Sequence, residues 1–108
     1  MAINEISVNE LTSLVENGSL VVDVREPDEY ESGHIPGAIL VPLSTVLENS
    51  GEFLSEDTVY VVCRSGGRSM QACELLHDNG IVNVVNVAGG TMGWIGLGNE
   101  IVTGEHPS

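Results

Sequence analysis

A cysteine that follows an apolar run carries the clearest chemical signal in the sequence. Cys63 stands directly after residues 58–62, Thr-Val-Tyr-Val-Val, and before the segment Arg-Ser-Gly-Gly-Arg-Ser. The paired glycines let the backbone curl so that several N–H groups point at one spot. A helix predicted to begin near Arg68 adds partial positive charge, and the two arginines add full charges. These surroundings favour a thiolate over a thiol, so we interpret Cys63 as an activated nucleophile in an anion-binding loop.

The six residues after Cys63 are predicted to hold the oxygens of an anionic substrate. Arg68 stands at the start of the helix and is expected to face the anion, whereas Arg64 is expected to point outward and select donors at the rim. In the alternative interpretation the arginines pair with surface acids, Ser69 has no role in binding, and Cys63 is a buried cysteine at a strand end. The full predicted binding loop is Arg64, Ser65, Gly66, Gly67, Arg68 and Ser69.

The chain is strongly acidic, because 16 Asp and Glu residues face three arginines, lysine is absent, and the formal net charge is −13. Such a charge repels phosphate backbones and anionic lipid surfaces, which argues against binding of nucleic acid or membranes. Arg64 and Arg68 nevertheless place two of the three positive charges within five residues of Cys63. This concentration of positive charge supports an anionic substrate at the loop.

Strand and helix patterns alternate along the chain and must position this loop. The predicted strands are the apolar runs at 20–24, 38–41, 58–62 and 82–87. A helix is predicted over residues 68–79 with Gly80 as its stop, and an earlier helix is predicted to begin at a capping box formed by Ser7 and Glu10. The alternation predicts an α/β fold with a mostly parallel sheet and helices on both faces.

The length of 108 residues fits a single domain, residues 1–108, with one core. Residues 1–9 carry no basic segment and no long apolar run, so a signal peptide is not predicted. No apolar stretch approaches the roughly 18 residues that a membrane helix needs. The expected location is therefore the cytoplasm.

Two cysteines, Cys63 and Cys73, are too few for a disulfide framework. Cys73 lies on the apolar stripe of its predicted helix, so we expect it in the core and not as a resolving thiol for Cys63. Cys73 and His77 stand four residues apart, a spacing that can bind a metal ion, but two ligands do not make a site. No metal site is predicted.

Four other side chains have types that could do chemistry. Asp23 and Arg25 stand at a predicted strand end and are expected to form a structural ion pair beneath the loop, the alternative being a charged pair in catalysis. His34, in the turn sequence Gly-His-Ile-Pro-Gly, is expected to stabilise that turn and not to act as a general base. Trp94 is expected to anchor the last short helix, the alternative being a place at the mouth of the site.

These features together resemble the rhodanese domain, a sulfurtransferase fold, over nearly the whole chain. Three motifs in the family's order and spacing carry the resemblance. They are Asp23-Val24-Arg25-Glu26 with Glu29-Tyr30 and Gly33-His34-Ile35-Pro36-Gly37-Ala38, then Cys63-Arg64-Ser65-Gly66-Gly67-Arg68, then Gly89-Gly90 with Trp94. The resemblance implies a small, mostly parallel sheet of about five strands flanked by helices on both faces.

By this resemblance, Cys63 takes a sulfane sulfur from a donor, becomes a persulfide, and passes the sulfur to a nucleophilic acceptor without a metal or organic cofactor. The loop Cys-Arg-x-Gly-x-Arg resembles the branch that uses thiosulfate, and it departs from the Cys-Gly-Ser-Gly-Val-Thr loop of the branch that uses 3-mercaptopyruvate. A compact dianion suits two arginines and a ring of N–H donors. The acceptors to consider are cyanide, thioredoxin, glutathione and a sulfur-carrier protein.

The net charge of −13 opposes a dianionic donor at long range. We therefore expect weak affinity for thiosulfate that improves with moderate salt, because salt screens the repulsion. A neutral or protein-bound persulfide donor would avoid that repulsion.

Two other functions of the same fold are alternatives to sulfur transfer. The phosphatases and arsenate reductases that resemble this family have five residues between the loop cysteine and its arginine, whereas four separate Cys63 from Arg68. That difference argues against phosphate as the substrate. A binding or regulatory module with an idle site would capture a partner protein through the same face and show no turnover.

Overall fold

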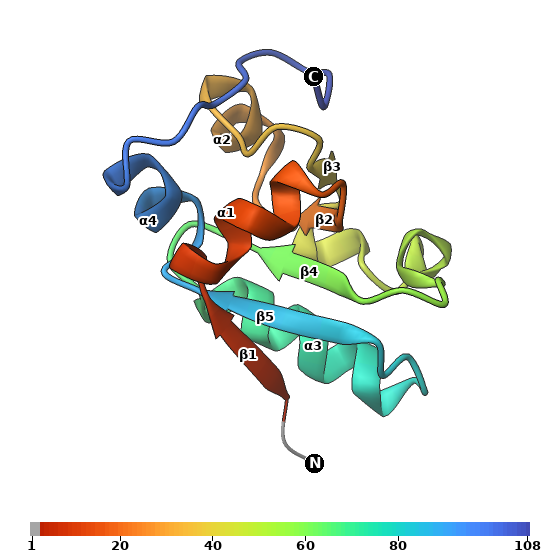
Figure 1. The fold of residues 1–108 in the computed structure, drawn as a ribbon. Coiled ribbons are helices and arrows are strands. Elements are labelled where there is room, and N and C mark those ends of the chain that lie inside the picture. Colours follow the sequence, from red (N-terminus) through yellow and green to blue (C-terminus); the bar gives the residue numbers. More distant parts are fainter. Residues whose placement is uncertain (1–2) are drawn as a thin grey trace.

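A parallel sheet forms the centre of the computed structural model, which describes residues 3–108 (Figure 1). Its five strands lie in the spatial order β1-β5-β4-β2-β3, and all neighbouring pairs run parallel. The strands are β1 (Asn4–Ser7), β2 (Leu20–Asp23), β3 (Ile39–Leu40), β4 (Val59–Val62) and β5 (Val84–Ala88). The predicted α/β fold with a parallel sheet of five strands is confirmed.

Helices cover both faces of the sheet, with α1 in front of it and α3 behind it in Figure 1. One face carries α1 (Val8–Glu16), α2 (Pro27–Ser32) and α4 (Gly90–Gly96), and the other carries α3 (Gly67–Asp78) with the 3-10 turns η1 (Leu43–Thr45) and η2 (Ser50–Phe53). Among residues 3–108, no helix combines the length and the apolar character that crossing a membrane requires.

The central strands are buried on both faces because alternate side chains join two hydrophobic cores. In β4, Val61 packs in the core beneath α3, whereas Val62 packs in the core beneath α1 and α4. β2 follows the same rule with Val22 and Val21. This two-sided burial explains why both strands are continuous apolar runs with little polar alternation.

The first strand and the start of α1 differ from the expectation. β1 lies at the edge of the sheet with three of its four residues exposed, so it lacks the apolar pattern that predicts a strand. The predicted capping box of Ser7 and Glu10 is wrong, because Ser7 makes no side-chain cap hydrogen bond and still pairs with Ala88 in the sheet. A capping box forms instead at α2, between Glu26 and Glu29.

The end of the chain runs alongside α2 (Figure 1). His34 and Val102 exchange two backbone hydrogen bonds of 2.9 Å. The fully buried ring of His34 stacks on Tyr30, and its nitrogens lie within hydrogen-bond distance of the carbonyl oxygens of Tyr30 and His106. The His34 side chain therefore connects α2 with the final segment, and its role in stabilising the turn stays a prediction.

Candidate active site

Cys63 lies at the carboxyl edge of the sheet, where two connections diverge. After β2 the chain passes through α2 to β3 on one side, and after β4 it passes through α3 to β5 on the other side. Such divergence leaves an opening between the ends of the two strands, which is the usual place for a ligand in an open α/β sheet. Cys63 directly follows β4 and Asp23 ends β2, so both residues lie at this opening.

The loop after β4 surrounds the sulfur of Cys63 with hydrogen-bond donors. The N–H of Gly66 donates to Sγ at 3.1 Å, and Ser69 Oγ lies 3.3 Å from Sγ. Burial raises the pKa of the Cys63 thiol, but hydrogen bonds from the Ser69 side chain and from the N–H groups of Ser69, Gly66 and Ser65 outweigh it. The pKa therefore lies below its ordinary value, in the direction of the thiolate that the sequence predicts.

The turn from β5 into α4 holds the loop from a second side. The N–H of Thr91 donates to the carbonyl oxygen of Cys63 at 2.9 Å, and the N–H of Met92 donates to that of Arg64 at 3.0 Å. Gly90 lies so close that an added Cβ would come within 2.6 Å of both carbonyl oxygens. The position of the Cys63 backbone is thus determined by this turn as well as by β4.

Arg68 reaches across the opening to α2. Its guanidinium makes two hydrogen bonds to the carboxylate of Glu29, at 2.7 and 2.9 Å. The hydrogen bonds lower the pKa of Glu29 to about 2 and raise the pKa of Arg68. The structure therefore places Arg68 in an ion pair with an acid, and its role in holding the substrate stays a prediction.

This ion pair predicts a specific loss of stability in acid. Because the pKa of Glu29 falls from 4.5 to about 2 on folding, its stabilising effect is complete above pH 4.5 and is lost as the pH falls towards 2. We expect Glu29→Gln to lower the free energy of unfolding at neutral pH by about 1 kcal/mol or less, and to show a weaker pH dependence in that window. Urea unfolding of wild type and Glu29→Gln between pH 2 and pH 7 measures both effects. If the free energy of unfolding of both proteins depends on pH in the same way, the ion pair does not contribute to stability.

Arg64 differs from the other two arginines in having no acidic partner among residues 3–108. It is exposed, and within the part of the chain that the structure describes it forms no ion pair. Arg25 is buried and bonds the carboxylate of Asp23 at 2.8 Å and the carbonyl oxygen of Gly33 at 2.9 Å. The predicted ion pair of Asp23 and Arg25 is present, and its purely structural role stays a prediction.

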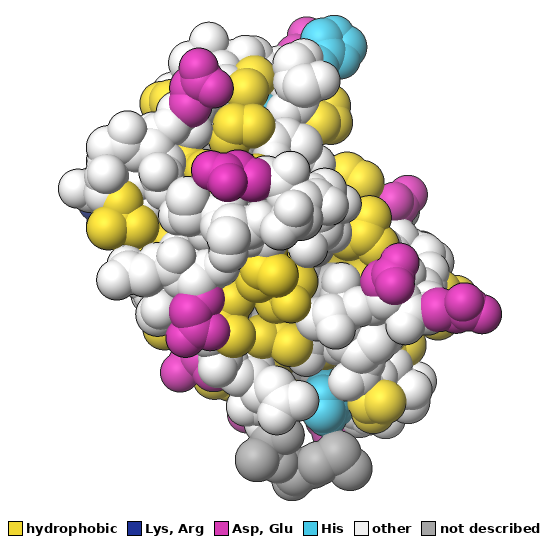
Figure 2. Space-filling model, in the orientation of Figure 1, with side chains coloured by type: hydrophobic (Ala, Val, Ile, Leu, Met, Phe, Trp, Pro, Cys, Tyr) yellow, Lys and Arg dark blue, Asp and Glu magenta, His cyan; other side chains and the backbone are white. Residues whose placement is uncertain are grey.

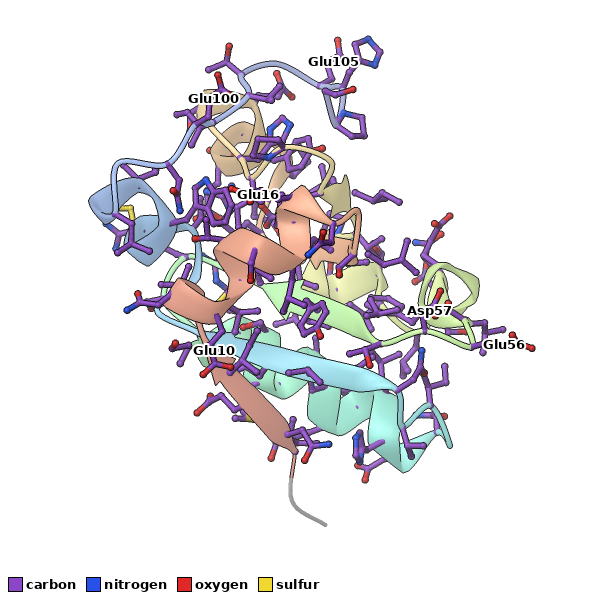
Figure 3. All side chains as sticks on the ribbon, viewed as in Figure 1. Glu10, Glu16, Glu56, Asp57, Glu100 and Glu105 are labelled. Atoms are coloured by element: carbon purple, nitrogen blue, oxygen red, sulfur yellow. The ribbon has the colours of Figure 1, made fainter. Side chains whose placement is uncertain are left out.

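Acidic side chains are spread over the molecule. The face in Figure 2 shows them separated by neutral and hydrophobic atoms. Figure 3 labels six of them: Glu10 and Glu16 on α1, Glu56 and Asp57 in the loop before β4, and Glu100 and Glu105 in the segment after α4. The net charge of −13 therefore places a negative field around the molecule that a small anion meets at long range.

Two residues to which the sequence assigned no separate role reach the loop through hydrogen bonds. Glu29 holds Arg68, and Asn86 in β5 accepts a hydrogen bond from Ser69 Oγ at 2.5 Å. Asn86 is 1% exposed. Its signal in the sequence is a polar side chain inside an apolar strand, because a buried amide must find hydrogen-bond partners.

Cys73 and Trp94 have structural places, as predicted. Cys73 is fully buried in the core beneath α3, where burial raises the pKa of its thiol to about 12. Trp94 is buried, and its Nε1 donates to the carbonyl oxygen of Glu100 at 2.7 Å, which ties α4 to the following segment. Within residues 3–108, no group of three or more His, Cys, Asp or Glu side chains could hold a metal ion.

Comparison with protein families gives a match over most of the chain. Residues 7–97 match the model of the rhodanese-like domain. The sulfurtransferase of Allochromatium vinosum is 35% identical over 105 residues, which cover 95% of this chain and 98% of that protein. Thiosulfate sulfurtransferase PspE of Escherichia coli is 40% identical over 70 residues, which cover 63% of this chain and 67% of that protein.

Some relatives are longer, and the match covers only 52% and 60% of the lengths of two proteins from Bacillus subtilis. Among solved structures, a rhodanese-related protein from Thermoplasma volcanium superposes with a TM-score of 0.84 at 33% identity. That match covers 94% of this chain and 99% of the other. The similarity therefore includes the β4–α3 loop and both elements that bracket it.

Proposed function

Because this chain belongs to the rhodanese-like domain family, we propose that it is a sulfurtransferase that carries sulfur as a persulfide on Cys63. One observation carries the proposal: the Cys63 sulfur lies at the carboxyl edge of the sheet, the Gly66 N–H donates to it at 3.1 Å, and Ser69 Oγ lies 3.3 Å from it. A cysteine whose pKa is lowered by such donors is equipped to attack a sulfur atom. The same donors would stabilise the anion that remains after the attack.

The proposed reaction has two balanced steps. The Cys63 thiolate attacks the outer sulfur of thiosulfate, a bond forms between Sγ and that sulfur, and the S–S bond of thiosulfate breaks with its electron pair leaving on sulfite. The product on the protein is the persulfide anion. A nucleophilic acceptor then attacks the terminal sulfur, and the electron pair of the Sγ–S bond returns to Sγ as a thiolate.

Arg64 is the side chain that we assign to the oxygens of the donor. Arg68 has its guanidinium on Glu29, whereas the exposed guanidinium of Arg64 offers its donors at the rim of the loop. Backbone N–H groups of residues 64–69 complete the proposed binding loop. The net charge of −13 should keep the affinity for thiosulfate weak and make it improve with moderate salt.

We propose thiosulfate and persulfides as the donors. The Escherichia coli relative is named a thiosulfate sulfurtransferase, which supports thiosulfate as the first donor to test. Cys63 is only 1% exposed, so the group that reaches it must be slender, as a terminal sulfur atom is. A thiol, cyanide or a sulfur-carrier protein would serve as acceptor.

Intact-protein mass spectrometry tests the proposal. Wild type, Cys63→Ala and Cys73→Ala are each incubated with thiosulfate, then separately with 3-mercaptopyruvate and with a persulfide donor. We expect wild type and Cys73→Ala to gain one sulfur atom, which a thiol or cyanide removes, and Cys63→Ala to gain none. Failure of every donor to load the wild type would favour a binding module, and sulfur on Cys63→Ala would move the carrier elsewhere.

A further inference from the structure

A buried chain of hydrogen bonds connects the sulfur of Cys63 to the edge strand β1. Ser69 Oγ lies 3.3 Å from Cys63 Sγ and 2.5 Å from Asn86 Oδ1. The amide Nδ2 of Asn86 lies 2.7 Å from Glu5 Oε2. Cys63, Ser69 and Asn86 are each at most 1% exposed, so water does not substitute for the contacts among these three residues, whereas Glu5 is exposed at the end of the chain of contacts. The chain crosses from α3 through β5 to β1, which lie next to one another in Figure 1.

The orientation of the Asn86 amide is set by its other partners. Nδ2 donates to the Glu5 carboxylate and, at 3.3 Å, to the carbonyl oxygen of Gly66. Both partners are acceptors in their usual states, so the NH₂ group must face them and Oδ1 must face Ser69. The side chain of Ser69 therefore meets a fixed acceptor on one side and a sulfur atom on the other.

Ser69 has one hydroxyl proton for these two acceptors. When Cys63 is a thiol, its S–H can point to Ser69 Oγ while the Ser69 O–H donates to Asn86 Oδ1, and every group is satisfied. When Cys63 is a thiolate, the Ser69 O–H must turn to Sγ, which leaves Asn86 Oδ1 buried without a donor. A buried acceptor without a partner is costly, so Asn86 opposes the thiolate form.

We propose that Asn86 is a positioning residue that restrains ionisation of Cys63 by competing for the hydroxyl proton of Ser69, and that Glu5 maintains this competition by fixing the Asn86 amide. An amide does not pass protons along, so the chain sets the direction of a hydrogen bond and does not carry the Cys63 proton to Glu5. The position of the Gly66 N–H, which also stabilises the thiolate, is unchanged in this scheme.

The competition for the Ser69 proton has a consequence for sulfur transfer, and that consequence rests on the proposed function. In the persulfide the negative charge sits on the terminal sulfur, and Sγ is bonded to it and uncharged. Ser69 can then return its proton to Asn86. Asn86 therefore favours the sulfur-loaded state over the free thiolate and makes the protein a better holder of sulfur.

The pH dependence of alkylation of Cys63 by iodoacetamide, followed by intact mass, tests the assignment without requiring any transfer activity. Cys73 provides little background because its pKa is about 12, whereas the pKa of Cys63 is lowered. We expect Asn86→Leu to lower the pKa of Cys63 by about one unit and Ser69→Ala to raise it by a similar amount. In the Ser69→Ala background, Asn86→Leu should have no effect, because Asn86 acts through the Ser69 hydroxyl.

Glu5 supplies a second pair of variants on an exposed edge, where folding is less at risk. Glu5→Ala frees the Asn86 amide to rotate and present its NH₂ group to Ser69, so the pKa of Cys63 should fall. Glu5→Gln keeps an acceptor oxygen for Asn86 and should leave the pKa unchanged, although it removes the same charge. Equal shifts in the two Glu5 variants would indicate a charge effect and overturn the assignment.

A rise of the Cys63 pKa in Asn86→Leu would also overturn the assignment, since it would mean that Asn86 only supports the loop. Persistence of the Asn86→Leu shift in the Ser69→Ala background would do the same. If no donor loads sulfur onto the wild type but the pKa of Cys63 shifts as expected in the variants, the proposed function is wrong and the role of Asn86 stands. The two proposals therefore fail in different experiments.

Discussion

Alanine in place of Cys63 is expected to lower kcat/KM for sulfur transfer from thiosulfate to cyanide at least about a thousandfold, or about 4 kcal/mol of transition-state stabilisation. A methyl group cannot attack the donor sulfur or hold it, and no other free thiol lies at the loop, since Cys73 is in the core beneath α3. The rate of thiocyanate formation measures the effect. The fold should persist, because the substitution removes one sulfur atom, and the midpoint of thermal unfolding checks this.

Cys73→Ala is the matched control for that experiment. It removes the same atom from a fully buried site, so we expect a loss of about 1–2 kcal/mol in the free energy of unfolding from the cavity that remains. Its transfer rate should stay near that of the wild type. Substantial turnover by Cys63→Ala would show that another residue carries the sulfur. Loss of turnover in a folded Cys73→Ala protein would show that Cys73 takes part in the reaction.

The parts of the fold and of the site that the sequence predicts are formed by residues close together in the chain. Residues 58–62 read as a buried strand because both faces of β4 are covered, and the glycines that follow place the loop at its end. Cys63, the loop and the start of α3 are contiguous, so their local pattern was sufficient. The pKa of Cys63 is lowered, as predicted. The groups that lower it are the hydrogen-bond donors of Ser69, Gly66 and Ser65, whereas the sequence predicts contributions from the arginines and the helix.

The partners that complete the site come from distant parts of the chain, where a single sequence gives little guidance. Glu29 is 39 residues from Arg68, and 16 acids compete for the role of its partner. Glu5 is 81 residues from Asn86, on an edge strand whose exposed residues carry no strand pattern. Only the sheet order, which brings β1 beside β5, shows that Glu5 can reach Asn86.

The Glu29 contact also changes the electrostatic interpretation of the loop. Counting charges in the sequence gives two arginines for one dianion, but one of them is already bonded to a carboxylate. Within the described part of the chain, the positive groups that are not already bonded to an acid are Arg64 and the backbone N–H groups with their partial charges. A donor with less charge than thiosulfate would lose less by this arrangement, which is why a persulfide belongs in the first set of assays.

Gly90→Ala is expected to be the most damaging small substitution at the β5–α4 turn. Gly90 has φ +55°, and its added Cβ would come within 2.6 Å of the carbonyl oxygens of Cys63 and Arg64. Neither carbonyl can move freely, because they accept hydrogen bonds from Thr91 and Met92. We expect a loss of at least about 2 kcal/mol in the free energy of unfolding from the strained backbone and the clash. We also expect about a hundredfold lower kcat/KM, because the loop must shift to make room.

Gly96→Ala, in the last turn of the same helix, separates this effect from helix propensity. An added Cβ there meets no atom within 4 Å and the backbone has an ordinary φ, so the variant should keep its activity and gain a few tenths of a kcal/mol in stability. Urea unfolding and the alkylation rate of Cys63 are measured for both variants beside wild type. If Gly90→Ala kept the wild-type free energy of unfolding but lost reactivity at Cys63, the clash would disturb the Cys63 loop without destabilising the fold. If it kept both properties, the close approach of Gly90 would not position Cys63, and the loop would depend on β4 and α3 only.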